Sequence, residues 1–281
     1  MVPVVSSRWE HDVNPDWLEE RKSVLTASEV AKLLPSWKKA VKAPGTISPE
    51  FAALWAEKNS DGLVDTSSPS QAAARGHVME PWAIDAWNDN VASASSPLPT
   101  FHHWDDILVA SDGIGFSPDG MDTVQPEGPV RLDVAKNGKA LKAPDGTLYK
   151  APSHILEVKA YDPRHHMKCC ITDRMSHDEL FQLAMAFCVL PLLETATLLF
   201  FCPAAPITMH YETYTREQLS KMIEIVGEIQ GMWNVQSRKC QELMEEYIAI
   251  GMMAGVSEQE IWEAHMRDRN IEVGQDDFRL R

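Results

Sequence analysis

Three residues carry the side chains best suited to chemistry: Asp119, Glu157 and Lys159. Glu157 and Lys159 stand two apart in the run Ile155-Leu-Glu157-Val-Lys159, whose apolar residues are typical of a central β-strand. Strand alternation directs both charged side chains to one face. Asp119 lies in the turn Ser117-Pro-Asp119-Gly120, at the end of another strand-like run. Two carboxylates and an ammonium group can therefore converge on one point.

Such a group of charges suits metal-assisted chemistry at phosphorus. Two carboxylates with one or two waters supply the hard oxygen ligands that Mg²⁺ prefers. The metal lowers the pKa of a bound water and stabilises the charge of a pentacoordinate phosphorus. Lys159 can position or deprotonate that water, or neutralise the phosphate. A lone Glu-x-Lys pair usually lies on a solvated strand face. Charged side chains on a central strand are costly without a function, and the nearby Asp119 favours a functional site.

Helical patterns come before these residues, and strand patterns surround them. Helices are predicted over 16–21, 29–34, 49–57 and 72–88, with Thr26 or Ser28 as the N-cap of the second, and loops over 35–48, 59–70 and 91–100. Strands over 107–110, 115–117, 121–124, 130–134 and 154–159 are expected to form a meandering antiparallel sheet with hairpin tips at Gly138 and Asp145-Gly146.

The rest of the chain returns to helices. A helix over 178–190, strands over 197–202 and 208–214, and helices over 215–250 and 258–269 are predicted. The order of elements predicts one α/β domain over residues 1–281. Its core is expected over about 17–214, with a helical N-terminal part and a helical C-terminal tail over 215–281.

Composition excludes several classes of protein. Of the 281 residues, 44% are hydrophobic and 24% are charged, which excludes a disordered, collagen-like or coiled-coil chain. Lys and Arg number 26 against 41 Asp and Glu, a net charge of −15, so any DNA contact must use local positive charge. Residues 131–174 supply it, with nine Lys or Arg against five acids, unless these are merely solvated loop residues.

The cysteines favour a reducing cytoplasm, and neither the histidines nor the apolar runs indicate a metal site or a membrane span. The five cysteines have neither metal-site spacing nor the even number of a disulfide framework, so reduced buried thiols are expected. His102-His103 and His165-His166 are poor chelates because adjacent strand residues point to opposite faces, although the second pair could contact DNA phosphate. No run approaches a membrane span of about 18 apolar residues, and no secretory signal opens the chain.

Five motifs together resemble the lambda-type phage exonucleases and YqaJ-like viral recombinases of the PD-(D/E)xK nuclease superfamily. Each motif is weak alone, but the five follow the order of that family between Trp17 and about Leu190. They are Trp17-Leu-Glu-Glu-Arg21 with Leu25-Thr-Ala-Ser28-Glu-Val30, Arg75-Gly-His-Val-Met-Glu80-Pro81, Ser117-Pro-Asp119-Gly-Met121, Leu156-Glu157-Val-Lys159, and Leu180-Phe-Gln182-Leu-Ala-Met-Ala-Phe187.

The resemblance implies a restriction-endonuclease-like core, a central mixed β-sheet flanked by helices, and a role for each motif. Asp119, Glu157 and the backbone carbonyl of Val158 would bind Mg²⁺, with Mn²⁺ as an alternative, and Lys159 would be the catalytic lysine. Glu80 would bind a second metal or its waters. Gln182 would steady the Lys159 region or the nucleophile. The resemblance also implies that Arg21 and Ser28 hold a DNA phosphate, which suits Ser28 at the start of a helix.

Three features depart from the pattern of that family. Ala160-Tyr161-Asp-Pro163 follows the lysine where the family usually has Cys-Pro or a similar turn, and Ala184 stands where the glutamine pattern often continues. Residues 126–152 also form a Lys-rich insertion between Asp119 and Glu157. These departures bear on substrate details and assembly, and leave the expected metal site intact.

The resemblance predicts a metal-dependent 5′→3′ exonuclease on linear double-stranded DNA. Such an enzyme would leave 3′ single-stranded tails for phage-type recombination. Double-stranded DNA ends, a single-strand annealing protein and a homotrimer are the implied partners. Two alternatives stay open: an endonuclease of restriction or junction-resolving type, and a catalytically inactive protein that binds DNA ends.

Overall fold

A computed structural model describes residues 20–42, 47–59, 71–92, 98–104, 106–111, 113–124, 131–172 and 175–253, with only the backbone for 71–75 and 247–253. The predicted helix over 258–269 and most of the one over 16–21 lie outside these residues. The chain divides into two compact units, residues 1–231 and 232–281. The second unit is described only as the continuation of the last helix, and the described strands all belong to the first.

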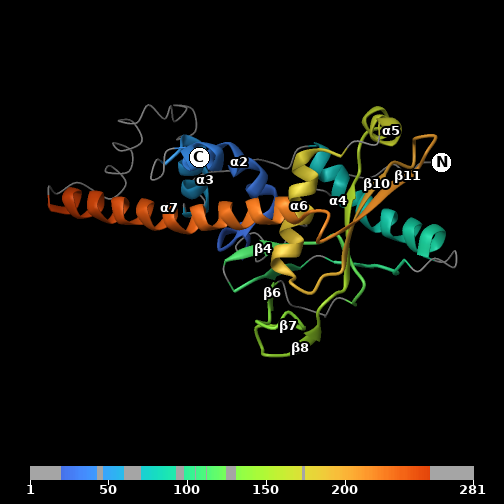
Figure 1. Cartoon of the computed structure of the whole chain (residues 1–281), viewed down its shortest axis with the longest axis horizontal. Helices are drawn as coiled ribbons and strands as arrows, with labels where there is room; N and C mark the ends of the chain where they lie inside the picture. Colours follow the sequence, from blue (N-terminus) through green and yellow to red (C-terminus); the bar gives the residue numbers. More distant parts are fainter. Residues whose placement is uncertain are drawn as a thin grey trace, which may run out of the picture. The chain divides into compact units, whose positions relative to one another are not determined.

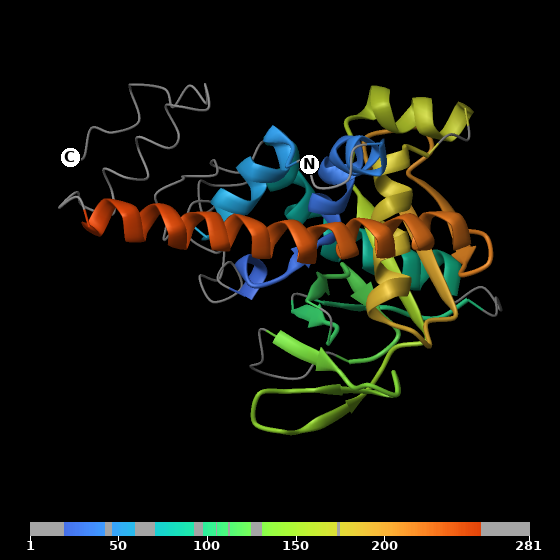
Figure 2. The ribbon, with the colours of Figure 1, turned by 60° about the vertical axis from the view of Figure 1, so that its left-hand side comes forward.

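The first unit combines helices with two mixed β-sheets (Figures 1 and 2). In chain order the elements are β1 (Leu25–Thr26), α2 (Ala27–Lys42), α3 (Pro49–Asn59), α4 (Gln71–Trp87), the π-helical η1 (Asn88–Ala92), β2 (His102–His103), β3 (Ile107–Val109), β4 (Ile114–Phe116), β5 (Gly120–Met121), β6 (Arg131–Val134), β7 (Ala140–Lys142), β8 (Leu148–Lys150), β9 (His154–Lys159), α5 (Pro163–Thr172), α6 (His177–Val189), β10 (Thr195–Phe201), β11 (Met209–Thr215) and α7 (Ser220–Met253).

The five-stranded sheet, in the order β11-β10-β9-β5-β2, holds the Glu157 strand at its centre. β9 pairs with β10 in parallel, with Glu157 opposite Leu198, and with β5 in antiparallel. The prediction of a meandering antiparallel sheet is therefore wrong. Parallel neighbours need a long crossover, and α5 and α6 provide it between β9 and β10.

The six-stranded sheet, in the order β1-β4-β3-β6-β7-β8, is also mixed. β1 pairs with β4 and β3 with β6 in parallel, whereas β6, β7 and β8 form an antiparallel meander. The predicted hairpin tips are confirmed at Gly138 and Gly146, which have positive φ angles of 69° and 90°. The molecule thus has two mixed sheets instead of the single central sheet expected, and the restriction-endonuclease-like core stays a prediction.

Two helices pack on the five-stranded sheet and explain its apolar strands. Ala83, Ile84 and Trp87 of α4 form one core cluster with Leu156 and Val158 of β9 and with Leu199 and Phe201 of β10. Alternation turns Glu157 and Lys159 to the opposite face, where α6 contacts β10. α6 is buried along most of its length, as its apolar run predicts. None of the helices in the described part of the chain has the length and hydrophobicity that crossing a bilayer requires.

Local signals fail at two helices. α2 continues through Pro35 to Lys42, where a loop was predicted, because its buried residues Ala27, Val30 and Leu33 keep helical spacing and α2 packs on α6. The loss of one backbone hydrogen bond at Pro35 is the smaller effect. α5 was not predicted at all, because only His166 and Cys169 on it are buried. α2 begins directly after Thr26, one of the two predicted caps.

Gly138, at the tip of the β6–β7 hairpin, lies close to Pro191 in the loop after α6. A Cβ atom at this position would lie 2.7 Å from Cγ of Pro191, on a backbone that already has positive φ. We expect Gly138→Ala to lower the free energy of unfolding by about 1–3 kcal/mol through strain and overlap. Gly146→Ala is the matched control, because its Cβ would enter open space and only the backbone cost remains. Urea unfolding of both variants checks this, and equal losses would contradict it.

Candidate active site

Asp119 lies directly before β5, beside the edge of β9 where the β5–β9 ladder stops. The β5–β9 ladder runs from Met121↔Ile155 to Gly120↔Leu156 and stops there. Beyond Leu156, the next β9 amide on this edge is that of Val158, and its N–H donates to Oδ2 of Asp119 at 2.6 Å. The backbone of Asp119 is held as well, because its carbonyl accepts from the N–H of Trp104 at 3.1 Å. The turn therefore fixes one carboxylate beside the central strand.

Glu157 and Lys159 form an ion pair on the α6 face of β9. Nζ of Lys159 donates to Oε1 of Glu157 at 2.7 Å. Glu157 is 7% exposed, and its Oε2 is buried without a hydrogen-bond partner among the described residues. A buried carboxylate oxygen without a donor is costly unless a cation or another donor meets it. Oε2 is therefore an open ligand position.

The charges of this group act on one another. The pKa of Asp119 is raised well above its usual value, first by burial and then by the negative charges of Glu157 and Glu80. Lys159 and the Val158 N–H offset only part of this rise. Burial alone would lower the pKa of Lys159, but the charges of Glu157 and Asp119 outweigh it and leave that pKa raised. Lys159 is thus a cation that donates hydrogen bonds and does not accept a proton.

Glu80 reaches the same group from α4. Its charge contributes to the raised pKa of Asp119, so the predicted ligand is brought within electrostatic reach. Oε2 of Glu80 also lies 3.5 Å from Nδ1 of His77 and 4.0 Å from Nε2 of His103. These two histidines were not predicted at the site. The His102-His103 dipeptide gave no sign of it, because the partner of His103 comes from a distant helix.

The residues fit a divalent metal bound by few protein ligands. Within the described residues, no three His, Cys, Asp or Glu side chains come close enough to form a ready-made metal cluster. Asp119 and Glu157 nevertheless offer carboxylate oxygens in a group that has an excess of negative charge. Mg²⁺ typically binds one or two carboxylates and keeps several waters. A cation here would meet the open Oε2 of Glu157 and relieve the repulsion on Asp119.

Arg21 and Ser28, the predicted phosphate ligands, are brought together at the start of α2. Nη2 of Arg21 donates to Oγ of Ser28 at 3.3 Å. Lys58 of α3, which no sequence signal indicated, stabilises the chain before α2 and the first turn of that helix. Its Nζ donates to the carbonyls of Arg21 and Val24 at 2.9 and 2.6 Å and lies 3.0 Å from Oε2 of Glu29. Burial lowers the pKa of Arg21, which the charge of Glu29 partly restores.

α6 contributes Gln182 and a residue that sequence reasoning missed, Glu179. Oε1 of Gln182 is buried and has no hydrogen-bond partner among the described residues, so it stays available as an acceptor. Glu179 is buried, accepts from the Ser176 N–H at 2.7 Å and from the hydroxyl of Tyr161, and its charge acts on Lys159. The Ser176-x-x-Glu179 capping box in the sequence was the signal that could have placed it.

Comparisons with known proteins return few matches. No protein-family model matches the chain, and no curated protein matches it at a significant level. Among solved structures, it is similar to an alkaline exonuclease from Laribacter hongkongensis, with 15% identity and a TM-score of 0.49, over 82% of this chain and 100% of that one. The same exonuclease in complex with dAMP matches with 15% identity and a TM-score of 0.47, over the same shares. Likeness of this degree leaves the function of this chain to its own residues.

Tyr161 is expected to stabilise the protein through its hydroxyl. Burial, and then Glu179, raises the pKa of Tyr161, so the phenol stays protonated and donates to a buried carboxylate. We expect Tyr161→Phe to lower the free energy of unfolding by about 1–3 kcal/mol, because Glu179 loses a donor. Tyr149→Phe is the control, since Tyr149 makes no side-chain hydrogen bond to a described residue. Urea unfolding measures both, and an unchanged midpoint for Tyr161→Phe would contradict the expectation.

Proposed function

We propose that the chain is a metal-dependent deoxyribonuclease that hydrolyses phosphodiester bonds. The observation that carries the proposal is the arrangement at the β5–β9 edge. Asp119 is fixed on the Val158 amide, and Lys159 is fixed on Glu157, whose second oxygen stays open. In a purely structural buried ion pair, both oxygens of the carboxylate would be expected to have hydrogen-bond partners.

Mg²⁺ would be held by Asp119 and Glu157, with the carbonyl of Val158 as a third ligand. The N–H and C=O of one strand residue point to the same side, so the carbonyl of Val158 is directed toward the Asp119 side like its amide. When bound, the metal supplies a polarised water and charge stabilisation at phosphorus. Glu80 would hold waters of the metal or a second ion.

Lys159 would act as a fixed positive charge beside the scissile phosphate. Its raised pKa favours this role over that of a general base. It can donate to a non-bridging phosphate oxygen or orient the attacking water while staying paired with Glu157. Preorganised charges of this kind contribute more than mobile ones, because they need no rearrangement during the reaction. Gln182, with its open oxygen, would accept a hydrogen bond from that water.

We further propose that cleavage starts at a 5′ end of linear double-stranded DNA. Arg21 and Ser28 meet at the first turn of α2, where a helix terminus favours anions, and would hold a phosphate. Lys58 and Glu29 keep that turn in place. A strand whose 5′-phosphate is held there would be cleaved from that end at the Lys159 site, as the resemblance to 5′→3′ exonucleases implies.

Linear duplexes labelled at either the 5′ or the 3′ end, with covalently closed circular DNA alongside, test this proposal. Early release of 5′ label from linear DNA, with intact circles, is the expected result. Cutting of the circle would replace the exonuclease by an endonuclease. DNA binding without products in Mg²⁺ or Mn²⁺ would leave a protein that only binds ends.

A further inference from the structure

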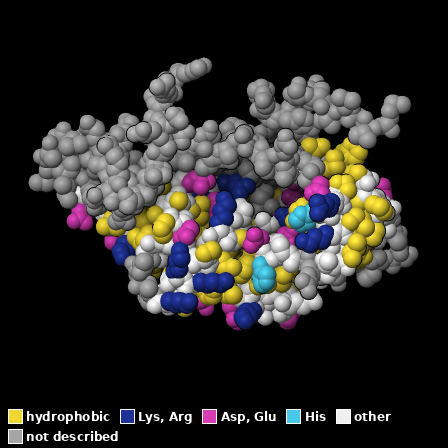
Figure 3. Space-filling model, turned by 90° about the horizontal axis from the view of Figure 1, so that it is seen from above, with side chains coloured by type: hydrophobic (Ala, Val, Ile, Leu, Met, Phe, Trp, Pro, Cys, Tyr) yellow, Lys and Arg dark blue, Asp and Glu magenta, His cyan; other side chains and the backbone are white. Residues whose placement is uncertain are grey.

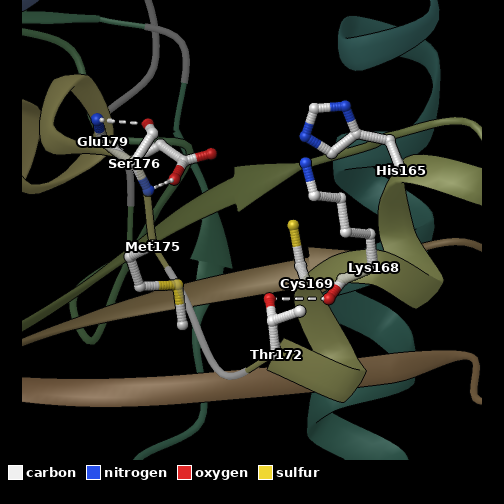
Figure 4. A pocket seen from close by; sticks show the side chains of 7 residues that line it. All are labelled: His165, Lys168, Cys169, Thr172, Met175, Ser176 and Glu179. Carbon is white, nitrogen blue, oxygen red and sulfur yellow. Dashed lines mark hydrogen bonds between the residues drawn. The ribbon is translucent and has the colours of Figure 1, made fainter.

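A pocket opens between α5 and the start of α6, close to Lys159 (Figure 4). Its wall includes Glu179, the carboxylate that acts on Lys159 and accepts from Tyr161. Glu179 therefore links the pocket to the proposed catalytic lysine. Its lining residues are His165, Lys168, Cys169, Thr172, Met175, Ser176 and Glu179.

The α5 side of the pocket is cationic. α5 carries Arg164 and Lys168 and no acidic residue, in a chain whose net charge is −15. Lys168 is exposed and forms no ion pair with another described residue. His165 and Lys168 are three residues apart on one side of the helix, and Figure 4 shows the Lys168 amino group directed toward the His165 ring. Figure 3 shows one face of the molecule, on which Lys, Arg and His side chains are interspersed with Asp and Glu.

His165 presents a rigid flat surface at this pocket. Its ring stacks on Tyr161, with centroids 4.2 Å apart and planes 29° apart, and Tyr161 stacks on the buried Phe200 at 5.8 Å. This aromatic column fixes the ring of His165, which is exposed to solvent. His166 differs, because it is fully buried and its Nε2 lies 2.7 Å from the carbonyl of Ile207. Only the first histidine of the pair is available to a ligand.

The acidic wall of the pocket does not oppose an anion strongly. One oxygen of Glu179 accepts from the Tyr161 hydroxyl and the other from the Ser176 N–H, and Lys159 balances its charge. Burial, and then Glu179, raises the pKa of the Cys169 thiol, so this side chain adds no charge. The groups left for a ligand are thus an ammonium group and an aromatic face.

We propose that this pocket binds one unpaired nucleotide of a DNA strand, with its base stacked on His165 and its phosphate on Lys168. The pairing of a cation with a stacking ring is the common chemistry of single-strand sites. Inside a duplex the faces of a base are covered by its neighbours, so the ligand must be unpaired. The inference rests on the proposed nuclease function, since it places this nucleotide next to the one being cleaved at Lys159.

Binding of a short oligothymidylate in EDTA, followed by fluorescence anisotropy, tests the pocket without cleavage. We expect His165→Ala to weaken binding about tenfold, because one stacked base is lost, and His165→Phe to bind like the wild type. Lys168→Ala should reduce the slope of log K against log salt by about 0.7, the effect of one phosphate contact on a single strand. Lys221→Ala, at another exposed lysine, is the matched control and should change neither quantity.

Two further ligands separate the contributions and the alternatives. An abasic oligonucleotide should bind the wild type about tenfold more weakly and should not distinguish His165→Ala from it. Wild-type affinity and salt slope in both His165→Ala and Lys168→Ala would overturn the proposal, and so would equal binding of polyglutamate and oligothymidylate. Hydrolysis of a chromogenic phosphodiester in Mg²⁺ keeps the two proposals apart. It should be unchanged in the pocket variants, and its absence in the wild type would count against the nuclease alone.

Discussion

Lys159→Met should lower the rate of Mg²⁺-dependent DNA cleavage by about 10³-fold while Mn²⁺ still binds. Removing one fixed electrostatic partner of a transition state typically costs about 10²–10³ in rate. The variant also leaves the buried carboxylate of Glu157 without its cation, so the protein without metal should be less stable. Single-turnover cleavage of a linear duplex measures the rate, and Mn²⁺ electron paramagnetic resonance measures metal binding.

Lys139→Met is the matched control for this prediction. Lys139 is an exposed lysine of the β6–β7 hairpin and forms no ion pair with a described residue, so its variant should cleave like the wild type in low salt. Cleavage by Lys159→Met within tenfold of the wild-type rate would show that this lysine is only a structural partner of Glu157.

Asp119→Asn should have opposite effects on stability and on activity. The folded-state pKa of Asp119 is raised, so the native protein holds this proton more tightly than the unfolded chain does. Wild-type stability therefore falls as pH rises from the unfolded value, about 3.9, through the raised folded value, and stays lower above it. An uncharged Asn avoids that loss and can still accept from the Val158 N–H. We expect a Tm several degrees higher at neutral pH, with cleavage lost.

Thermal unfolding with and without Mg²⁺ checks this second prediction. Mg²⁺ should raise the Tm of the wild type and leave that of Asp119→Asn almost unchanged, because a ligand stabilises only the state that binds it. Each kcal/mol corresponds to about 2–4 °C in a unit of this size. Asp145→Asn is the control with the opposite sign, since hydrogen bonds from Thr147 lower the pKa of the exposed Asp145. A lower Tm for Asp119→Asn at neutral pH would refute the expectation.

The sequence carried the local part of the site well. Alternation in the β9 run predicted that Glu157 and Lys159 share a face, and the structure joins them by an ion pair. The Ser-Pro-Asp-Gly run predicted a turn at the end of a strand, and the structure places Asp119 in the connection between β4 and β5, directly before β5. Its bond to the Val158 amide depends on the register of β5 and β9. The direction of pairing was not readable, because parallel and antiparallel strands have the same alternation.

Sequence patterns did not indicate the residues whose roles depend on tertiary contacts. Lys58 looks like any charged residue near the end of a helix, and its role appears only when α3 packs against the turn after Arg21. The position of Glu179 depends on the capping box with Ser176 and on the hydroxyl of Tyr161, which lies just before α5, a helix that was not predicted. Pro35 argued for a loop, but the apolar face of α2 outweighed it. Local rules fail where burial of distant residues decides the conformation.

The most direct test of the central claim is metal-dependent hydrolysis by the wild type and by Glu157→Gln. Both proteins would be incubated with 5′-labelled linear duplex DNA in Mg²⁺ and in EDTA, and acid-soluble label would be counted. We predict release by the wild type in Mg²⁺ only, and none by Glu157→Gln, whose amide is a weaker ligand and no longer balances Lys159. Release by Glu157→Gln at the wild-type rate, or by the wild type in EDTA, would contradict a metal site built on Asp119 and Glu157.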